Sequence, residues 1–137
     1  MIAKSLMAAS AGILLALGVI HLTYTFAGAQ LTPRDPTLQI AMSQISPVLT
    51  RETTMWKAWV GFNASHSIGA ILFGLIYGYL ALLQSEILFR SHFLLIVGLA
   101  MVGGLLVLSK IYWFSVPFWS ICVSFACYGA SVVASRT

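Results

Sequence analysis

The sequence predicts an all-α membrane protein with four transmembrane helices in an antiparallel up-down bundle and a short amphipathic interfacial helix in the first loop. Of the 137 residues, 60% are apolar and only 7% are charged, whereas charged residues make up about a quarter of soluble domains. The apolar residues form four blocks, each close to the roughly 20 residues that cross a hydrocarbon core about 30 Å thick. We therefore expect residues 1–137 to form one transmembrane domain.

The first span is expected at residues 5–28. Two stripes at helical spacing run along it, the first formed by Ala8, Gly12 and Ala16 and the second by Ala11, Leu14, Gly18, His21 and Thr25. Small residues four apart let membrane helices approach closely. The second stripe must face protein, because an imidazole exposed to lipid is costly.

The chain then leaves the bilayer, since Pro33, Pro36 and Pro47 interrupt any long helix. Asp35 can cap a short helix that has Pro36 at its first position. The apolar residues of this helix share one face and are Leu38, Ala41, Met42 and Ile45. This pattern predicts a helix on the membrane surface or over the helix ends.

The second span is expected at residues 55–83, with Trp56 and Trp59 at the membrane interface. It carries two stripes of small residues, Gly61, Ser65 and Gly69 on one side and Ala70, Gly74 and Gly78 on the other. Two such faces predict a central helix with a neighbour on each side. A tight turn is expected at residues 84–91.

The third and fourth spans are expected at residues 93–112 and 117–135, with Pro117 opening the fourth. Between these two spans the chain reaches the membrane–water interface, which Lys110 and Trp113 mark. The residues expected to contact other helices or lipid are Trp56, Trp59, Ser67, Gly74, Gly78, Lys110 and Trp113.

A polar turn inside the second span is the main functional clue, and it consists of Asn63, Ser65, His66 and Ser67. With a rise of 1.5 Å per residue, His21 lies roughly 10 Å inside the end of the first span and His66 roughly 15 Å inside the same membrane face. The two imidazoles and Asn63 should therefore lie at a similar depth and point toward protein.

Three interpretations of this cluster stay open. The polar groups can fix helix packing in an accessory or assembly subunit of a larger membrane complex. His21 and His66 can instead bind haem b or a transition metal. Alternatively, the cluster forms a lipid-binding pocket or a small intramembrane enzyme, with His66 as acid or base and Asn63 orienting the substrate.

The three acidic residues, Asp35, Glu52 and Glu86, all fall in loops or at helix ends. Their positions argue against proton relays, cation transport and chemistry that needs paired acids. An enzyme is therefore less favoured than an accessory subunit, and no catalytic residue is assigned beyond the candidates His66 and Asn63.

The segment W-x-x-W-x-G-F-N-x-S-H, which begins at Trp56 and ends at His66, resembles the second helix of a family of small, functionally uncharacterised bacterial four-helix membrane proteins. The resemblance is most specific over residues 56–74, and elsewhere it covers the hydropathy profile and a histidine late in the first span. It implies the four-helix fold and a bacterial inner-membrane location, and it implies no known activity.

Seven scattered Lys and Arg give a net charge of +4, and without a basic run they do not indicate a nucleic-acid surface. The expected partners are membrane lipids and other integral membrane chains, in a hetero-complex or a homo-oligomer. Lys and Arg are nearly balanced across the membrane, with Lys4, Arg90 and Arg136 on one side and Arg34, Arg51, Lys57 and Lys110 on the other. We assign both termini to the cytoplasm, because the first loop, with its Pro and Thr residues, resembles an outer-side segment and a single Lys precedes the first span.

Overall fold

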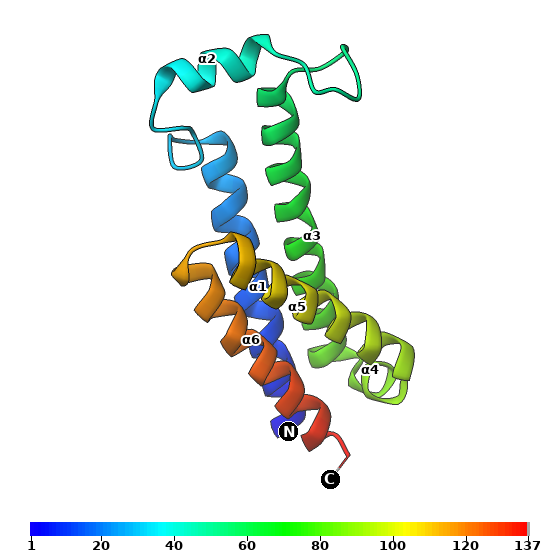
Figure 1. Ribbon diagram of the computed structural model, residues 1–137. Coiled ribbons are helices and arrows are strands. Elements are labelled where there is room, and N and C mark those ends of the chain that lie inside the picture. The colour runs from blue at the N-terminus through cyan, green and yellow to red at the C-terminus, as the bar shows by residue number, and fades with distance from the viewer. Residues whose placement is uncertain (137) are drawn as a thin grey trace. The chain divides into compact units, whose positions relative to one another are not determined.

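The computed structural model describes residues 1–136, and within them every regular element is a helix (Figure 1). The helices are α1 (Ile2–Phe26), α2 (Pro36–Gln44), α3 (Met55–Leu83), α4 (Ser85–Arg90), α5 (His92–Tyr112) and α6 (Ser115–Ala134). Of these, α1, α3, α5 and α6 are long and apolar enough to cross a membrane. The all-α, four-span fold is thus confirmed, and the chain is a small integral membrane protein.

Several helix boundaries differ from the expected ones: the first span ends at Phe26 rather than at residue 28, and the fourth begins at Ser115 rather than at Pro117. The first span starts at Ile2 rather than at residue 5. The tight turn expected at residues 84–91 instead contains α4, whose Leu88 is fully buried. Burial of this side chain holds the segment in a helical turn, and Ser91 Oγ then caps α5 by accepting a hydrogen bond from the backbone N–H of Leu94 at 3.2 Å.

The first loop carries the predicted short helix. Asp35 Oδ1 accepts hydrogen bonds from the backbone N–H and the hydroxyl of Thr37, at 2.9 and 2.7 Å, and Pro36 is the first helical residue. Figure 1 shows α2 lying across the ends of α1 and α3 that this loop connects. Among its apolar residues, Leu38 is exposed and Met42 is half-buried, as expected for a helix at an interface.

The protein divides into two compact units, which we call unit 1 and unit 2. Unit 1 comprises residues 1–17 and the chain from residue 70 onward, and unit 2 comprises residues 18–69. Helices α1 and α3 each contribute to both units.

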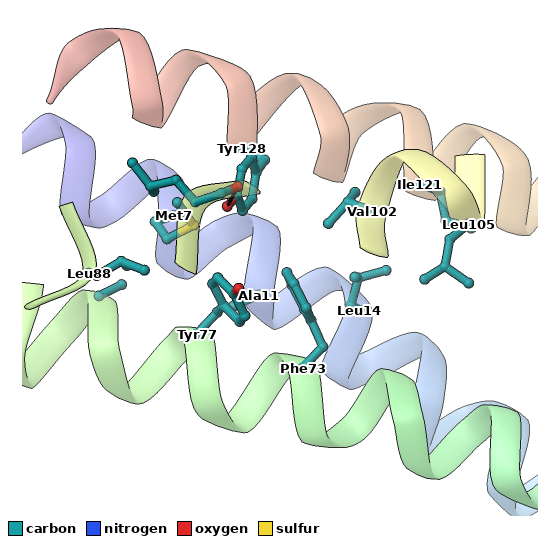
Figure 2. Close-up of a cluster of buried hydrophobic side chains, with 12 residues drawn as sticks. Met7, Ala11, Leu14, Phe73, Tyr77, Leu88, Val102, Leu105, Ile121 and Tyr128 are labelled. Carbon is teal, nitrogen blue, oxygen red and sulfur yellow. Dashed lines mark hydrogen bonds between the residues drawn. The ribbon is translucent and has the colours of Figure 1, made fainter. Parts of the chain in front are cut away.

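Unit 1 contains a hydrophobic core to which α1, α3, α4, α5 and α6 all contribute (Figure 2). Its largest fully buried apolar side chains are Met7, Leu14, Leu88, Val102, Ile121 and Tyr128. The rings of Phe73 and Tyr77 stack on the α3 side of this core, with centroids 4.3 Å apart. Each span therefore buries one stripe in unit 1.

The backbones of α1 and α3 approach closely at Gly74. A Cβ atom added there would lie 2.6 Å from Leu15 Cβ and 2.8 Å from the carbonyl oxygen of Ala11. At Gly78, one turn along, an added Cβ would lie 3.8 Å from Ala11 Cβ, which is ordinary contact. The face of α3 that carries Ala70, Gly74 and Gly78 is therefore turned toward the inside of unit 1.

The other two stripes of small residues are mostly exposed, although Ala8 packs against the hydrophobic core. Gly12 and Ala16 of α1 are exposed, as are Gly61 and Ser65 of α3. In unit 1, α1 buries instead the neighbouring face that contains Met7, whose side chain is part of the hydrophobic core.

Hydroxyl groups join α1 to α6. Ser124 Oγ donates to the carbonyl oxygen of Ser10 at 3.0 Å, and the two serine hydroxyls lie 2.9 Å apart. Ser131 Oγ donates to the carbonyl oxygen of Ala3 at 2.7 Å. Because both bonds connect side chain to backbone, they fix the register of the two helices and keep the hydroxyls paired in an apolar environment.

Two tyrosines converge on α5. Tyr77 Oη donates to the carbonyl oxygen of Leu94 at 2.6 Å, and Tyr128 Oη donates to that of Leu95 at 2.8 Å. Gly98 provides the space, since a Cβ atom there would overlap the hydroxyl of Tyr128 and the ring of Tyr77. The N-terminal half of α5 is thus clamped by α3 and α6.

Candidate functional site

The histidine–asparagine cluster, formed by His21, Asn63 and His66, lies within unit 2. His21 Nε2 lies 3.0 Å from Asn63 Oδ1. The Asn63 amide nitrogen donates to the carbonyl oxygen of Trp59 at 2.8 Å, so its oxygen faces the imidazole. His21 Nε2 therefore carries the proton and donates it to this oxygen.

The two imidazoles contact each other. The rings of His21 and His66 have centroids 5.6 Å apart and meet edge to face at 79°. On its other side the His66 ring stacks with Phe62, with centroids 6.4 Å apart and planes 11° apart. Phe62 is 68% exposed, so the His66 ring lies between the His21 ring and the exposed ring of Phe62.

Neighbouring hydroxyls complete the hydrogen bonding of this region. Ser67 Oγ donates to the carbonyl oxygen of Asn63, and Thr25 Oγ1 donates to that of His21, both at 2.8 Å. Asn63 and Ser67 are buried. These bonds give each hydroxyl hydrogen an acceptor within its own helix, so that neither is left unpaired in the lipid, and the backbone stays helical.

The tryptophans at the start of α3 lie close to the loop that carries α2. Trp59 Nε1 donates to the carbonyl oxygen of Leu31 at 3.0 Å, and the backbone N–H of Met55 donates to that of Ile45 at 2.8 Å. Trp59 is 42% exposed and Trp56 is half-buried. An indole at a membrane interface commonly keeps one polar contact of this kind.

The cluster has only part of a metal-binding shell. Two imidazoles supply two nitrogen ligands, and among residues 1–136 no group of three or more His, Cys, Asp or Glu side chains is placed to hold a metal ion. A haem iron held by both rings would need one nitrogen from each, and His21 Nε2 is engaged by Asn63. Ligation by His21 would therefore use Nδ1 or a rotated ring.

Two more of the predicted contact residues, Lys110 and Trp113, lie in unit 1. Lys110 is exposed, with Nζ 5.0 Å from the centroid of the Phe118 ring, a cation–π contact. Trp113 packs against the hydrophobic core. Cys122 and Cys127 are free thiols, each half-buried.

Sequence reasoning found the residues of the cluster but not their pairing. A single polar turn in α3 and a histidine in α1 predicted a shared depth, and the His21–Asn63 bond and the ring contact agree with it. The contact of Ser10 with Ser124 was missed because single serines are common in membrane helices. Gly98 was missed because its partners, two tyrosines, are distant in sequence.

Comparisons with protein-family models, with curated proteins and with solved structures found no match for this chain.

Proposed function

We propose that this small membrane protein is an accessory or assembly subunit that packs beside another integral membrane chain. The observation that supports this is the outward face of α1 in unit 1. Four successive outward positions on this face carry small residues, namely Ser5, Ala9, Gly12 and Ala16, and all are exposed. We call this surface the small face of α1.

The small face of α1 suits a helix better than lipid. Lipid-facing positions elsewhere in unit 1 include large side chains such as Leu99 of α5 and Val123 of α6, which are 45% and 55% exposed. At Gly12 an added Cβ would meet no atom within 4 Å. Small residues four apart allow a second helix to reach backbone contact, where packing and weak hydrogen bonds stabilise the pair.

The polar cluster fits the same role. The His21–Asn63 hydrogen bond links α1 to α3, and such bonds contribute about 0.6 to 2 kcal/mol each in membranes. This is enough to favour one register of two helices over others. A chain whose intramembrane polar groups stabilise its own packing presents a rigid surface to a partner.

The test uses two glycines that are both exposed and both lack neighbours within 4 Å of an added Cβ, Gly12 on α1 and Gly104 on α5. Gly12→Leu should abolish co-purification of a defined partner in mild detergent, while Gly104→Leu should retain it. In a background with both native cysteines replaced by serine, Gly12→Cys should crosslink to that partner in native membranes.

Three results would refute the accessory role. One is a wild-type chain that migrates alone, and another is equal recovery of the partner with both leucine variants. Crosslinking of Gly12→Cys only to a second copy of the chain would replace the hetero-complex with a homo-oligomer.

A second candidate function, binding of a transition metal, is favoured by the edge-to-face contact of His21 with His66. Further ligands would come from solvent or from a partner chain. Metal analysis and an absorption spectrum of the purified protein test it. Stoichiometric metal, or a Soret band, that His66→Ala removes would support a cofactor role over a purely structural one.

We also propose that the chain belongs to the bacterial four-helix family that the segment from Trp56 to His66 resembles. We further propose an inner-membrane location, and, from the composition of the first loop and the single Lys before the first span, both termini in the cytoplasm. Reporter fusions test the orientation: a C-terminal green fluorescent protein should be fluorescent, and a C-terminal alkaline phosphatase should be inactive. The opposite pair of results would invert the topology.

A further inference from the structure

A shallow, open polar depression lies in unit 1 beside α4 and the residues that follow α6. It has a volume of about 440 Å³ and is lined by Ser85, Glu86, Phe89, Arg90, Ser135 and Arg136. We call it the arginine pocket.

An apolar groove of about 290 Å³ lies beside it, between α5 and α6. The α5 side of the groove includes Leu95 and Leu99, and the α6 side includes Gly129 and Val132. Arg136 lines both the groove and the arginine pocket. The charged depression and the apolar groove therefore adjoin at Arg136.

The charges of the arginine pocket favour an anion. Arg90 and Arg136 contribute two positive charges, and Glu86 contributes one negative charge, which leaves an excess of one positive charge. The guanidinium group matches phosphate oxygens in a two-bond arrangement. The carboxylate of Glu86 is suited to accept hydrogen bonds from hydroxyl groups beside the phosphate.

We propose that the arginine pocket and the adjoining groove form a binding site for an anionic glycerophospholipid. Arg90 and Arg136 bind its phosphate group, and one acyl chain lies in the groove between α5 and α6. A headgroup with hydroxyls, such as that of phosphatidylglycerol, pairs with Glu86. Basic pockets between transmembrane helices at a membrane surface bind anionic headgroups in this way.

The groove distinguishes a lipid from free phosphate. The hydroxyl of Tyr128, which also lines the groove, is bonded to the carbonyl oxygen of Leu95, so it is not free to bind an anion. At Gly129 an added Cβ would meet no atom within 4 Å. The space above this glycine remains open for an alkyl chain, and an inorganic phosphate would make no use of it.

Native mass spectrometry of the full chain, released from nanodiscs with equal amounts of phosphatidylglycerol and phosphatidylcholine, tests the proposal. The wild type should retain one phosphatidylglycerol in preference to phosphatidylcholine. Arg90→Gln combined with Arg136→Gln should reduce this preference by about tenfold or more, because bonds to charged groups are among the stronger ones. Gly129→Leu should fill the groove and weaken retention of both lipids.

Gly104→Leu is the matched control, since it adds the same side chain at an open glycine outside the groove. It should retain phosphatidylglycerol as the wild type does. Equal retention of the two lipids by the wild type would overturn the proposal. Displacement of the lipid by millimolar inorganic phosphate, or a Gly129→Leu variant that behaves as wild type, would overturn the role of the groove and the acyl chain.

Discussion

Replacing Gly74 with alanine adds one methyl group where the backbones of α1 and α3 lie in contact. The new carbon would stand 2.6 Å from Leu15 Cβ, 2.8 Å from the carbonyl oxygen of Ala11 and 2.9 Å from Leu15 Cα. All three are shorter than a real Cβ tolerates, and two of the three atoms belong to the backbone. The helices must therefore separate, and no change of rotamer can relieve the overlap.

Gly78→Ala is the control for this change. It makes the same substitution on the same face of α3, one turn away, where the added carbon would lie 3.8 Å from Ala11 Cβ. Both variants gain about 1 kcal/mol of helix propensity, so this contribution cancels when they are compared. The difference between them is the cost of overpacking, about 1 to 3 kcal/mol. Gly74→Ala should be the less stable variant by this amount.

Reversible unfolding in mixed micelles with increasing dodecyl sulfate, followed by the fluorescence of the four tryptophans, measures the free energy of unfolding of each variant. Against a typical stability of about 5 to 15 kcal/mol, the expected difference is well resolved. Equal free energies of unfolding for Gly74→Ala and Gly78→Ala would refute the close approach of α1 to α3 at Gly74. Gly74→Leu should prevent assembly of the bundle, and Leu82→Phe, at an exposed position, should be tolerated.

Three further predictions concern hydrogen bonds. Asn63→Ala removes the acceptor of His21 and should lower the free energy of unfolding by about 0.6 to 2 kcal/mol; a double-mutant cycle with His21→Ala that gives no coupling energy would contradict the bond. Tyr128→Phe leaves the core volume unchanged and removes one bond to Leu95, so it should cost about 0.5 to 1.5 kcal/mol, and no loss in the same unfolding assay would exclude a contribution from that bond. The hydrogen bonds from Thr37 hold the pKa of Asp35 below its ordinary value of 3.8. The stability that this cap gives α2 is therefore fully present above pH 3.8, and it is lost as the pH falls through the lower pKa of the folded state. The Thr37 amide resonance should report that titration, and a midpoint at or above 3.8 would refute the cap.

The four spans and α2 were predictable because their causes are local. Each span is a run of apolar residues of membrane-crossing length, and the start of α2 depends on Asp35 and Pro36, which are adjacent in the chain. That His21 and Asn63 lie at the same level of their two helices was predictable for the same reason, since position along a helix follows from residue counting.

Which face of a span is buried was harder to predict. Gly12 and Gly74 have the same local signature of small residues four apart, yet Gly12 is exposed and Gly74 is buried. The difference depends on what the other helices supply. Ser10 contacts Ser124, and Gly74 contacts Ala11. The sequence around these residues indicates neither pairing.

The contacts between Ser10 and Ser124, which are 114 positions apart, have a consequence for the order of assembly. Helix α1 is held by α6, which is made later, through this contact and through the bond from Ser131 to Ala3. During synthesis α1 must remain in the bilayer without its final neighbour until α6 has been inserted. A chain truncated after α5 therefore lacks the hydrogen bonds that hold Ser10 and the register of α1. A separately expressed α6 should re-form these bonds.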